Sequence, residues 1–245
     1  MSYTPGNFSN YGETFTTMSR YSVKQRSDIL TLFPSDFNPN SILEVGCADG
    51  ANLKFFADYF NIPNKNIMGL DICQSESSPI SDFNFMNISI EEFLEVSENC
   101  FDVILLSDVL EHIYNPWQIL TKLKSHLNRG GIIAISVPNL QNLHYIRTLL
   151  SGDFFYSDTG LMDETHIRFF TLKSIYKYLD QAGYMIIKNH WRPDSSLNEL
   201  RKKIEGYLSK ESKCTLNMGS GNVVIDRTNI DNFFGQQIII SATHA

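Results

Sequence analysis

Residues 42–53 read ILEVGCADGANL, an apolar run that breaks into a turn of small residues and then resumes with helical spacing. The run carries Glu44 near its end, and Gly46, Ala48 and Gly50 make up the turn. Small residues let the backbone approach a ligand closely at the carboxyl end of a strand. The segment predicts a strand, a ligand-binding turn and a helix. Taken alone, it also fits an ordinary strand-to-helix connection.

Short apolar runs of strand length recur along the chain and are separated by segments with helical periodicity. They lie at 41–45, 66–71, 83–88, 101–107 and 131–137, with two later runs at 184–191 and 236–243. Alternation of this kind predicts an α/β fold with a parallel sheet, and the two late runs are expected to close its edge.

Helix boundary signals support this reading. Asn115 and Pro116 have the residue types of an N-cap and a first helical position, and Thr171 is placed as the cap of a helix that ends before Gly183. A further helix is expected near 195–209, followed by a loop over 217–222. We expect an N-terminal cap segment at 1–35, a core at 36–191 with a substrate cap within 139–170, and a C-terminal part of the same domain at 192–245.

The composition of the 245-residue chain excludes several classes of function. The net charge of −7 and the lack of long Lys/Arg clusters disfavour nucleic-acid binding. No apolar run approaches the roughly 20 residues of a membrane span, and the N-terminus lacks a basic and apolar leader, so we expect a cytoplasmic protein. The four cysteines are widely spaced and form no C-x-x-C pair, which predicts reduced thiols.

The turn is a poor dinucleotide fingerprint, because Ala48 and Ala51 occupy two of its three glycine positions. Its spacing instead resembles the acidic-x-G-x-G-x-G motif of class I S-adenosylmethionine-dependent methyltransferases. Asp71 follows Gly50 by 21 positions, where a carboxylate can accept hydrogen bonds from both ribose hydroxyls. Asn87 stands where these enzymes usually place an Asp near the adenine amine. Residues 101–116, FDVILLSDVLEHIYNP, resemble the fourth-strand motif of the same superfamily.

This resemblance implies a Rossmann-like fold with a mostly parallel seven-stranded sheet, helices on both faces, and S-adenosylmethionine as cofactor. The residues expected to contact the cofactor lie in the turn, at the strand ends and in one upstream position: Arg26, Glu44, Gly46, Cys47, Ala48, Gly50, Asp71, Ile72, Asn87, Ile88 and Ser107.

Residues 136–184 show a narrower resemblance, centred on the sequence DETHIRFF. The segment is similar to a bacterial branch found with polysaccharide-synthesis and glycosyltransferase genes. The core also resembles the O-methyltransferases of ubiquinone biosynthesis, whose upstream arginine and acidic-x-x-Glu-His cluster match Arg26, Asp108, Glu111 and His112. Together these likenesses imply O-methylation of a sugar or polysaccharide precursor for a capsule, lipopolysaccharide or related glycan.

A sugar hydroxyl is a poor nucleophile and needs a general base or a stabilising cation. His166, in the polar segment before the helix at 172, and His112, after the fourth strand, are equal candidates for the base. Asp108, Glu111 and His112 have i, i+3, i+4 spacing, so a helical turn would place them on one face. They are candidate Mg²⁺ ligands, although a metal-free site in which Asp108 braces the cofactor is preferred.

Other side chains fit an acceptor. Tyr11, Tyr21, Phe154, Phe155 and Tyr156 are expected to flank the pocket, whereas Phe169 and Phe170 are expected in the core. Arg147 and Arg168 could grip a phosphate or carboxylate of a nucleotide-linked acceptor. The expected partner is a small-molecule or glycan acceptor, and a homodimer is compatible with the sequence.

Three alternatives remain open. The first is an N-methyltransferase acting on an amino sugar or amide. The second is an NAD-dependent sugar dehydrogenase or epimerase, which is supported only by the Y-x-x-x-K pair of Tyr184 and Lys188. The third is a non-catalytic cofactor-binding scaffold.

Overall fold

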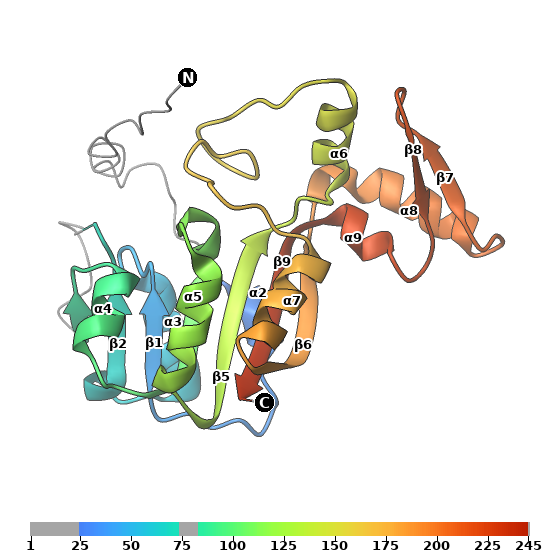
Figure 1. Cartoon of the computed structure of the whole chain (residues 1–245). Helices are drawn as coiled ribbons and strands as arrows, with labels where there is room; N and C mark the ends of the chain where they lie inside the picture. The colour runs from blue at the N-terminus through green and yellow to red at the C-terminus, as the bar shows by residue number, and fades with distance from the viewer. Residues whose placement is uncertain (1–24, 74–82, 245) are drawn as a thin grey trace, which may run out of the picture.

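The computed structural model describes residues 25–73 and 83–244 (Figure 1). The expected cap segment at 1–35 therefore lies mostly outside the described residues, as do Tyr11 and Tyr21. All four cysteines are free.

A seven-stranded sheet with the order β3-β2-β1-β4-β5-β9-β6 forms the centre of the molecule. β9 runs antiparallel to both of its neighbours, and the other neighbouring strands pair in parallel. The strands are β1 Ile42–Val45, β2 Ile67–Leu70, β3 Asn84–Met86, β4 Phe101–Ser107, β5 Leu127–Pro138, β6 Tyr184–Pro193 and β9 Gly235–His244. The predicted α/β class with its mostly parallel sheet is confirmed, and the late run at 236–243 closes the sheet between β5 and β6.

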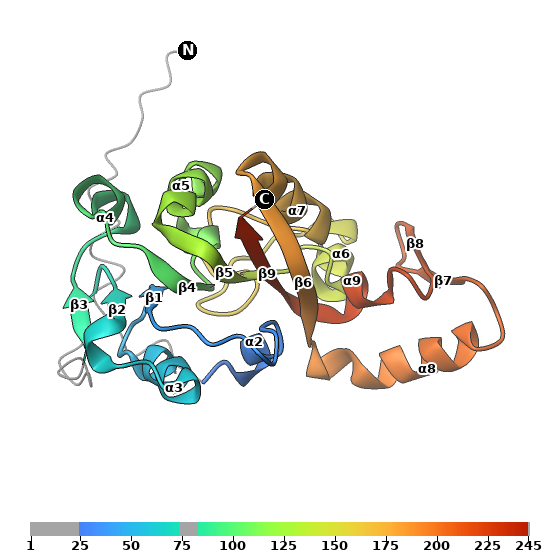
Figure 2. The same ribbon diagram turned by 90° about the horizontal axis from the view of Figure 1, so that it is seen from below.

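Helices cover both faces of the sheet (Figure 2). On one face are α2 Ser27–Leu30 and α3 Ala51–Phe60, and on the other are α4 Ile90–Val96, α5 Pro116–Leu123 and α7 Leu172–Gln181. Each face has its own apolar cluster, built around Phe56 on the first and Phe93 on the second. The central strands are therefore buried on both sides, which explains their continuous apolar runs. Short 3₁₀ turns in this part of the molecule include η3 Asn64–Asn66, η5 Leu110–His112 and η6 Lys124–His126.

The predicted helix caps are confirmed. Asn115 accepts a hydrogen bond from the Gln118 amide with Pro116 at the first helical position, and Thr171 forms a capping box with Ser174. Each cap sets the residue at which its helix, α5 or α7, begins.

A third group of elements lies beyond one end of the sheet (Figure 1). It consists of α6 Leu143–Leu150, η7 Ser195–Leu197, α8 Asn198–Leu208, the hairpin of β7 Cys214–Asn217 and β8 Asn222–Ile225, and α9 Ile230–Phe234. These elements share a separate apolar cluster that includes Leu143, Ile204 and Phe234. The expected helix and loop are present, but the two short hairpin strands were missed because each contributes only four residues of weak alternation.

Candidate active site

The turn between β1 and α3 has a left-handed backbone at three positions. Gly46, Ala48 and Gly50 have φ of 69°, 48° and 76°. The amides of Gly46 and Cys47 both donate to the Leu70 carbonyl, at 2.8 and 3.0 Å, and hold the turn against the end of β2. A backbone of this shape favours glycine, and Ala48 adopts it despite its side chain.

Neighbouring side chains leave no room for larger residues at the two glycines. A Cβ atom on Gly46 would come within 2.9 Å of Val109 Cγ2, and one on Gly50 would overlap the Phe83 ring. Val109 and Phe83 are therefore packed closely against these two positions of the turn.

Two buried polar atoms beside the turn have no hydrogen-bond partner among the described residues. Asn52 Nδ2 donates to one oxygen of the Glu44 carboxyl, while Glu44 Oε2 has no partner. Ser107 Oγ, at the end of β4, has none either. Burial raises the pKa of Glu44 to about 8. Unpartnered buried atoms around an open backbone turn fit a ligand rich in hydrogen-bonding groups, as S-adenosylmethionine is.

Asp71 stands at the end of β2 and faces the turn. Its carboxylate accepts hydrogen bonds from the amides of Ala48 at 2.7 Å and Cys73 at 2.8 Å. Burial raises the pKa of Asp71, and the backbone hydrogen bonds act in the opposite direction. Asn87 Nδ2 donates to the Asp71 carbonyl at 2.9 Å, so the two predicted cofactor residues are adjacent.

Ile72 lies two residues after the end of β2, and Ile88 lies two residues after the end of β3, at the same edge of the sheet. The Ile72 side chain is 56% exposed and Ile88 is half-buried. An exposed isoleucine beside a polar turn can pack against a flat ring of a ligand.

Arg26 is buried at the start of α2 and bridges two acidic residues. Its guanidinium binds Asp28 through Nε and Nη2 and Asp108 through Nη1, the latter at 2.9 Å. Nη1 also donates to Ser136 Oγ at 3.1 Å, and the Arg26 amide donates to Asn52. Burial by itself would lower the pKa of Arg26, but the hydrogen bond with Asp28 and the charges of Asp108, Asp28 and Glu111 together outweigh it and raise the pKa. Arg26 thus ties the segment before α2 to the ends of β4 and β5.

Asp108 does not belong to the helical turn that was expected to carry it. Its φ is 58°, and the 3₁₀ turn begins only at Leu110. Its carboxylate accepts hydrogen bonds from Arg26, Ser136 and Gln237. The expected single face of Asp108, Glu111 and His112 was therefore wrong, because a left-handed residue breaks the helical spacing between them.

The structure instead brings His112 and His166 together. Their ring centroids are 4.8 Å apart and the rings meet edge to face. His112 Nδ1 lies 3.2 Å from the Thr165 carbonyl, and His166 Nδ1 lies 3.1 Å from the Leu161 carbonyl. A carbonyl requires a donor, so each neutral ring carries its proton on Nδ1 and leaves Nε2 as a base.

Glu111 completes this cluster. It is fully buried, and neither carboxyl oxygen has a hydrogen-bond partner among the described residues. Its ligand atoms and those of His112 and His166 all lie within 4.8 Å of one another, and in the described part of the chain this is the only such group of three or more. Burial raises the pKa of Glu111 well above its usual range, and the charge of Asp108 adds to the effect.

The two candidate arginines do not point to a shared anion site. Arg168 donates to the Tyr114 carbonyl and lies over the rings of Tyr114 and Trp117, at 4.9 and 5.4 Å from their centroids. Arg147 is exposed on α6 and lines a hollow of about 390 Å³ between α6, α8 and the hairpin. The expected pair is not formed.

The aromatic residues of the acceptor segment are divided between surface and core. Phe154, Phe155 and Tyr156 are exposed, and Phe154 contacts both Tyr156 and Phe169 edge to face. Phe170 is buried as expected, but Phe169 is 36% exposed, which corrects its assignment to the core. In the extended segment before α7, successive side chains point in opposite directions, so only one of the pair faces inward.

The Tyr184 and Lys188 pair does not form a catalytic unit. Tyr184 is buried in β6 and donates to the Leu120 carbonyl, and Lys188 donates to the Thr31 carbonyl. Both groups have structural partners, which removes the only feature that favoured a dehydrogenase.

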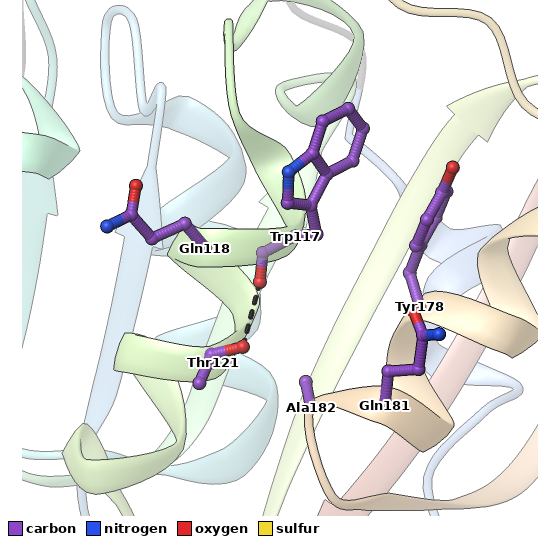
Figure 3. Close-up of a pocket in the computed structure, with 6 residues that line it drawn as sticks. All are labelled: Trp117, Gln118, Thr121, Tyr178, Gln181 and Ala182. Atoms are coloured by element: carbon purple, nitrogen blue, oxygen red, sulfur yellow. Dashed lines mark hydrogen bonds between the residues drawn. The ribbon is translucent and has the colours of Figure 1, made fainter.

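A hollow of about 420 Å³ lies between α5 and α7 (Figure 3). Trp117 and Tyr178 stand on its two sides with ring centroids 5.2 Å apart, and Gln118 and Gln181 add amide groups to its rim. It contains none of the predicted site residues.

Sequence reasoning missed three side chains near the site. Ser136 and Gln237 bind Asp108, and the buried Tyr145 hydroxyl has no partner among residues 25–73 and 83–244. Ser136 lies at the end of a predicted strand and could have been found by the rule that located Ser107. Tyr145 and Gln237 carry no local signal, because long-range packing brings them to the site.

Within the described part of the chain, every helix is too short or too polar to cross a bilayer.

The sequence of this chain is similar to those of known methyltransferases. Residues 19–189 match a family model described as a methyltransferase domain. The ubiquinone biosynthesis O-methyltransferase of Rickettsia canadensis is 24% identical over 181 residues, which cover 66% of this chain and 74% of the relative.

Two solved structures share the fold. An S-adenosylmethionine-dependent methyltransferase from Archaeoglobus fulgidus superposes with a TM-score of 0.55 at 18% identity and covers 88% of this chain and 89% of its own. The 1,6-didemethyltoxoflavin-N1-methyltransferase of Burkholderia thailandensis, solved with its substrate and S-adenosylhomocysteine, gives 0.53 at 14% identity, with 90% and 78% covered.

Proposed function

We propose that this chain methylates a hydroxyl group of a sugar or polysaccharide precursor. The chain belongs to the methyltransferase domain family and is an S-adenosylmethionine-dependent methyltransferase. The pair of His112 and His166 carries the proposal. Two adjacent imidazoles that bond carbonyls through Nδ1, and so present Nε2 as a base, are what a hydroxyl acceptor needs and what a free amine does not.

The cofactor half of the site is proposed to run from Asp71 to Arg26. Asp71 accepts the ribose hydroxyls, Asn87 receives the adenine amine, and the left-handed turn at Gly46–Gly50 supplies backbone contacts. When bound, S-adenosylmethionine supplies a methyl group on a positively charged sulfur. Arg26 and Asp108, already paired, provide opposite charges for the carboxylate and ammonium of the methionyl end.

The acceptor half is proposed to position a hydroxyl against the histidine pair. Nε2 of one imidazole would take the proton of the acceptor hydroxyl as its oxygen receives the methyl group and the thioether product is released, and the second imidazole fixes the orientation of the first. The hydrogen bonds from Nδ1 to the Thr165 and Leu161 carbonyls hold both rings to the segment between α6 and α7. This segment passes over the carboxyl ends of the strands (Figure 1).

A sugar acceptor is supported by the sequence of this segment and by its exposed aromatic side chains. Phe154, Phe155 and Tyr156 offer ring faces on which a pyranose can stack. The N-methyltransferase reading for an amino sugar or amide differs in the atom that receives the methyl group.

Product analysis tests the proposal. Purified enzyme is incubated with methyl-labelled S-adenosylmethionine and matched pairs of free and nucleotide-linked sugars with either a hydroxyl or an amino group at one carbon. We expect the label on oxygen, in an ether that NMR identifies. Transfer to nitrogen only, or no transfer to any sugar, would reject the O-methylation proposal.

We propose that the reaction proceeds without a metal ion. Glu111, His112 and His166 could hold a divalent cation, which is the second candidate arrangement and replaces the ligand set expected from sequence. The metal-free form is preferred because the sulfonium is already an activated electrophile and because the site contains two bases.

A further inference from the structure

Two buried polar side chains near the histidine pair have no hydrogen-bond partner among the described residues. They are Glu111, through both carboxyl oxygens, and Tyr145, through its hydroxyl. Glu111 is 0% and Tyr145 is 3% exposed. A buried polar group without a partner is energetically unfavourable, so each of these side chains calls for a ligand.

The two side chains come from different elements. Glu111 lies in η5 after β4, and Tyr145 lies in α6 above the end of the sheet (Figure 1). One segment joins the two elements, because the Arg168 amide donates to the Glu111 carbonyl at 3.0 Å and the Phe170 carbonyl accepts from the Leu140 amide, just before α6, at 2.8 Å. Burial raises the pKa of the Tyr145 hydroxyl, and the charge of Glu111 raises it further. The same Glu111 carboxyl lies within the 4.8 Å cluster that contains His112 and His166.

The backbone around Glu111 is fixed to the acceptor segment. The amides of Ile167 and Arg168 both donate to the Glu111 carbonyl, at 2.9 and 3.0 Å. These two hydrogen bonds join Glu111 to the segment that carries His166, and they hold the carboxyl and the base in one unit. A group bound by Glu111 is therefore positioned relative to the base.

The chemistry of the two groups selects a hydroxyl. A carboxyl oxygen of Glu111 accepts a hydrogen bond in either protonation state. Tyr145 offers an O–H donor. An alcohol accepts from Tyr145 and donates to the Glu111 carboxyl, which satisfies both groups.

We propose that Glu111 and Tyr145 form a subsite for a second hydroxyl of the acceptor, adjacent to the hydroxyl that is methylated. The acceptor is then a vicinal diol, whose two oxygens are closer together than the 4.8 Å span of the cluster. This inference rests on the proposed function, and it makes Tyr145 a specificity-determining residue.

Small diols test the subsite without knowledge of the full acceptor. Full-length protein saturated with S-adenosylhomocysteine is titrated, in buffer with a chelator, with cis- and trans-1,2-cyclohexanediol and with cyclohexanol, followed by NMR. We expect at least one diol to bind about fivefold more tightly than cyclohexanol, the value of one hydrogen bond. Tyr145→Phe should abolish this preference and leave cyclohexanol binding unchanged.

Tyr184→Phe is the matched control, because Tyr184 is also 3% exposed but donates to the Leu120 carbonyl at 3.0 Å. Tyr184→Phe should lower the melting temperature and retain the diol preference, whereas Tyr145→Phe should not lower it. Equal binding of diol and alcohol, a preserved preference in Tyr145→Phe, or a fall in its melting temperature as large as that of the control would overturn the subsite.

Catechol separates this inference from the proposed function. Tyr145-dependent binding of catechol without binding of either cyclohexanediol would support the subsite and reject a sugar acceptor. Diol binding that appears only after Mg²⁺ or Mn²⁺ is added would overturn the subsite in favour of a cation on Glu111.

Discussion

The turn between β1 and α3 and the segment between α6 and α7 both lie at the carboxyl ends of the strands, but different bonds hold them. In the turn, the backbone amides of Gly46, Cys47 and Ala48 donate to Leu70 and Asp71, a short distance along the sheet. In the second segment, contacts reach back across the chain, as from Ile167 to Glu111. The turn is therefore held by the neighbouring strand end, whereas the acceptor segment is held by longer-range packing.

The polar atoms of the two regions differ in part. The Asp71 carboxylate is held by backbone amides, and beside the turn Glu44 and Ser107 each leave one atom without a partner among the described residues. In the acceptor half, both oxygens of the Glu111 carboxyl and the Tyr145 hydroxyl lack such a partner. A cofactor shared by a whole family suits a cradle fixed largely by backbone, while a particular acceptor is recognised by side chains that the fold leaves unsatisfied. Mutations should therefore divide into those that affect cofactor affinity and those that affect turnover.

Loss of a histidine should give the largest effect. His166→Ala or His112→Ala should reduce turnover by about 100- to 10,000-fold, the range for a general base, while calorimetry shows unchanged S-adenosylhomocysteine affinity. His126→Ala is the control, because this buried ring also bonds a carbonyl but lies in η6, before β5 begins. Turnover of both site variants within a few-fold of that of His126→Ala would remove the base from the acceptor half.

A methyl group at Gly50 should disturb the cofactor half. Gly50→Ala combines a φ of 76° with overlap of the Phe83 ring, and should lower the free energy of unfolding by about 2 to 4 kcal/mol. Gly152→Ala is the matched control, because its φ of 86° is also positive but its Cβ would meet open space. Chemical denaturation should separate the two, and equal losses would mean that strain alone, without close packing, explains the glycine.

The same division decides what the sequence could predict. The positions of the main-sheet strands, the caps at Asn115 and Thr171 and the turn at Gly46 follow from local periodicity and small-residue spacing, and each was predictable. The contact of His112 with His166 was not, because it depends on where a long connection returns to the sheet. The prediction that Asp108 shares a helical face with Glu111 and His112 was wrong for a local reason, because its left-handed φ interrupts the helical spacing.

Asp71→Ala should have an intermediate effect restricted to the cofactor. Removal of a charged acceptor for the ribose hydroxyls should weaken S-adenosylhomocysteine binding by about 1 to 3 kcal/mol, measured by calorimetry. Asp58→Ala on the outer face of α3 provides the control, since its partner is the exposed Lys54. Wild-type affinity in the Asp71 variant would reassign this carboxylate to bracing the turn.

The pH dependence of turnover should show the smallest shift. Burial lowers the pKa of His112, and the neighbouring His166 lowers it further. A base must be neutral, and a lowered pKa keeps it neutral to lower pH, so the acid limb of the turnover profile should lie below the ordinary value of about 6.5. An acid limb at or above that value would show that His112 is not the base.

The central claim is that an imidazole, not a metal ion, activates the acceptor hydroxyl, and chelation tests it most directly. Enzyme dialysed against a chelator and shown to be free of bound metal is assayed for methyl transfer before and after addition of Mg²⁺ or Mn²⁺. The account predicts full activity in the demetallated enzyme, with no gain on adding either ion. Complete loss that either ion restores would contradict it and make Glu111, His112 and His166 a metal site.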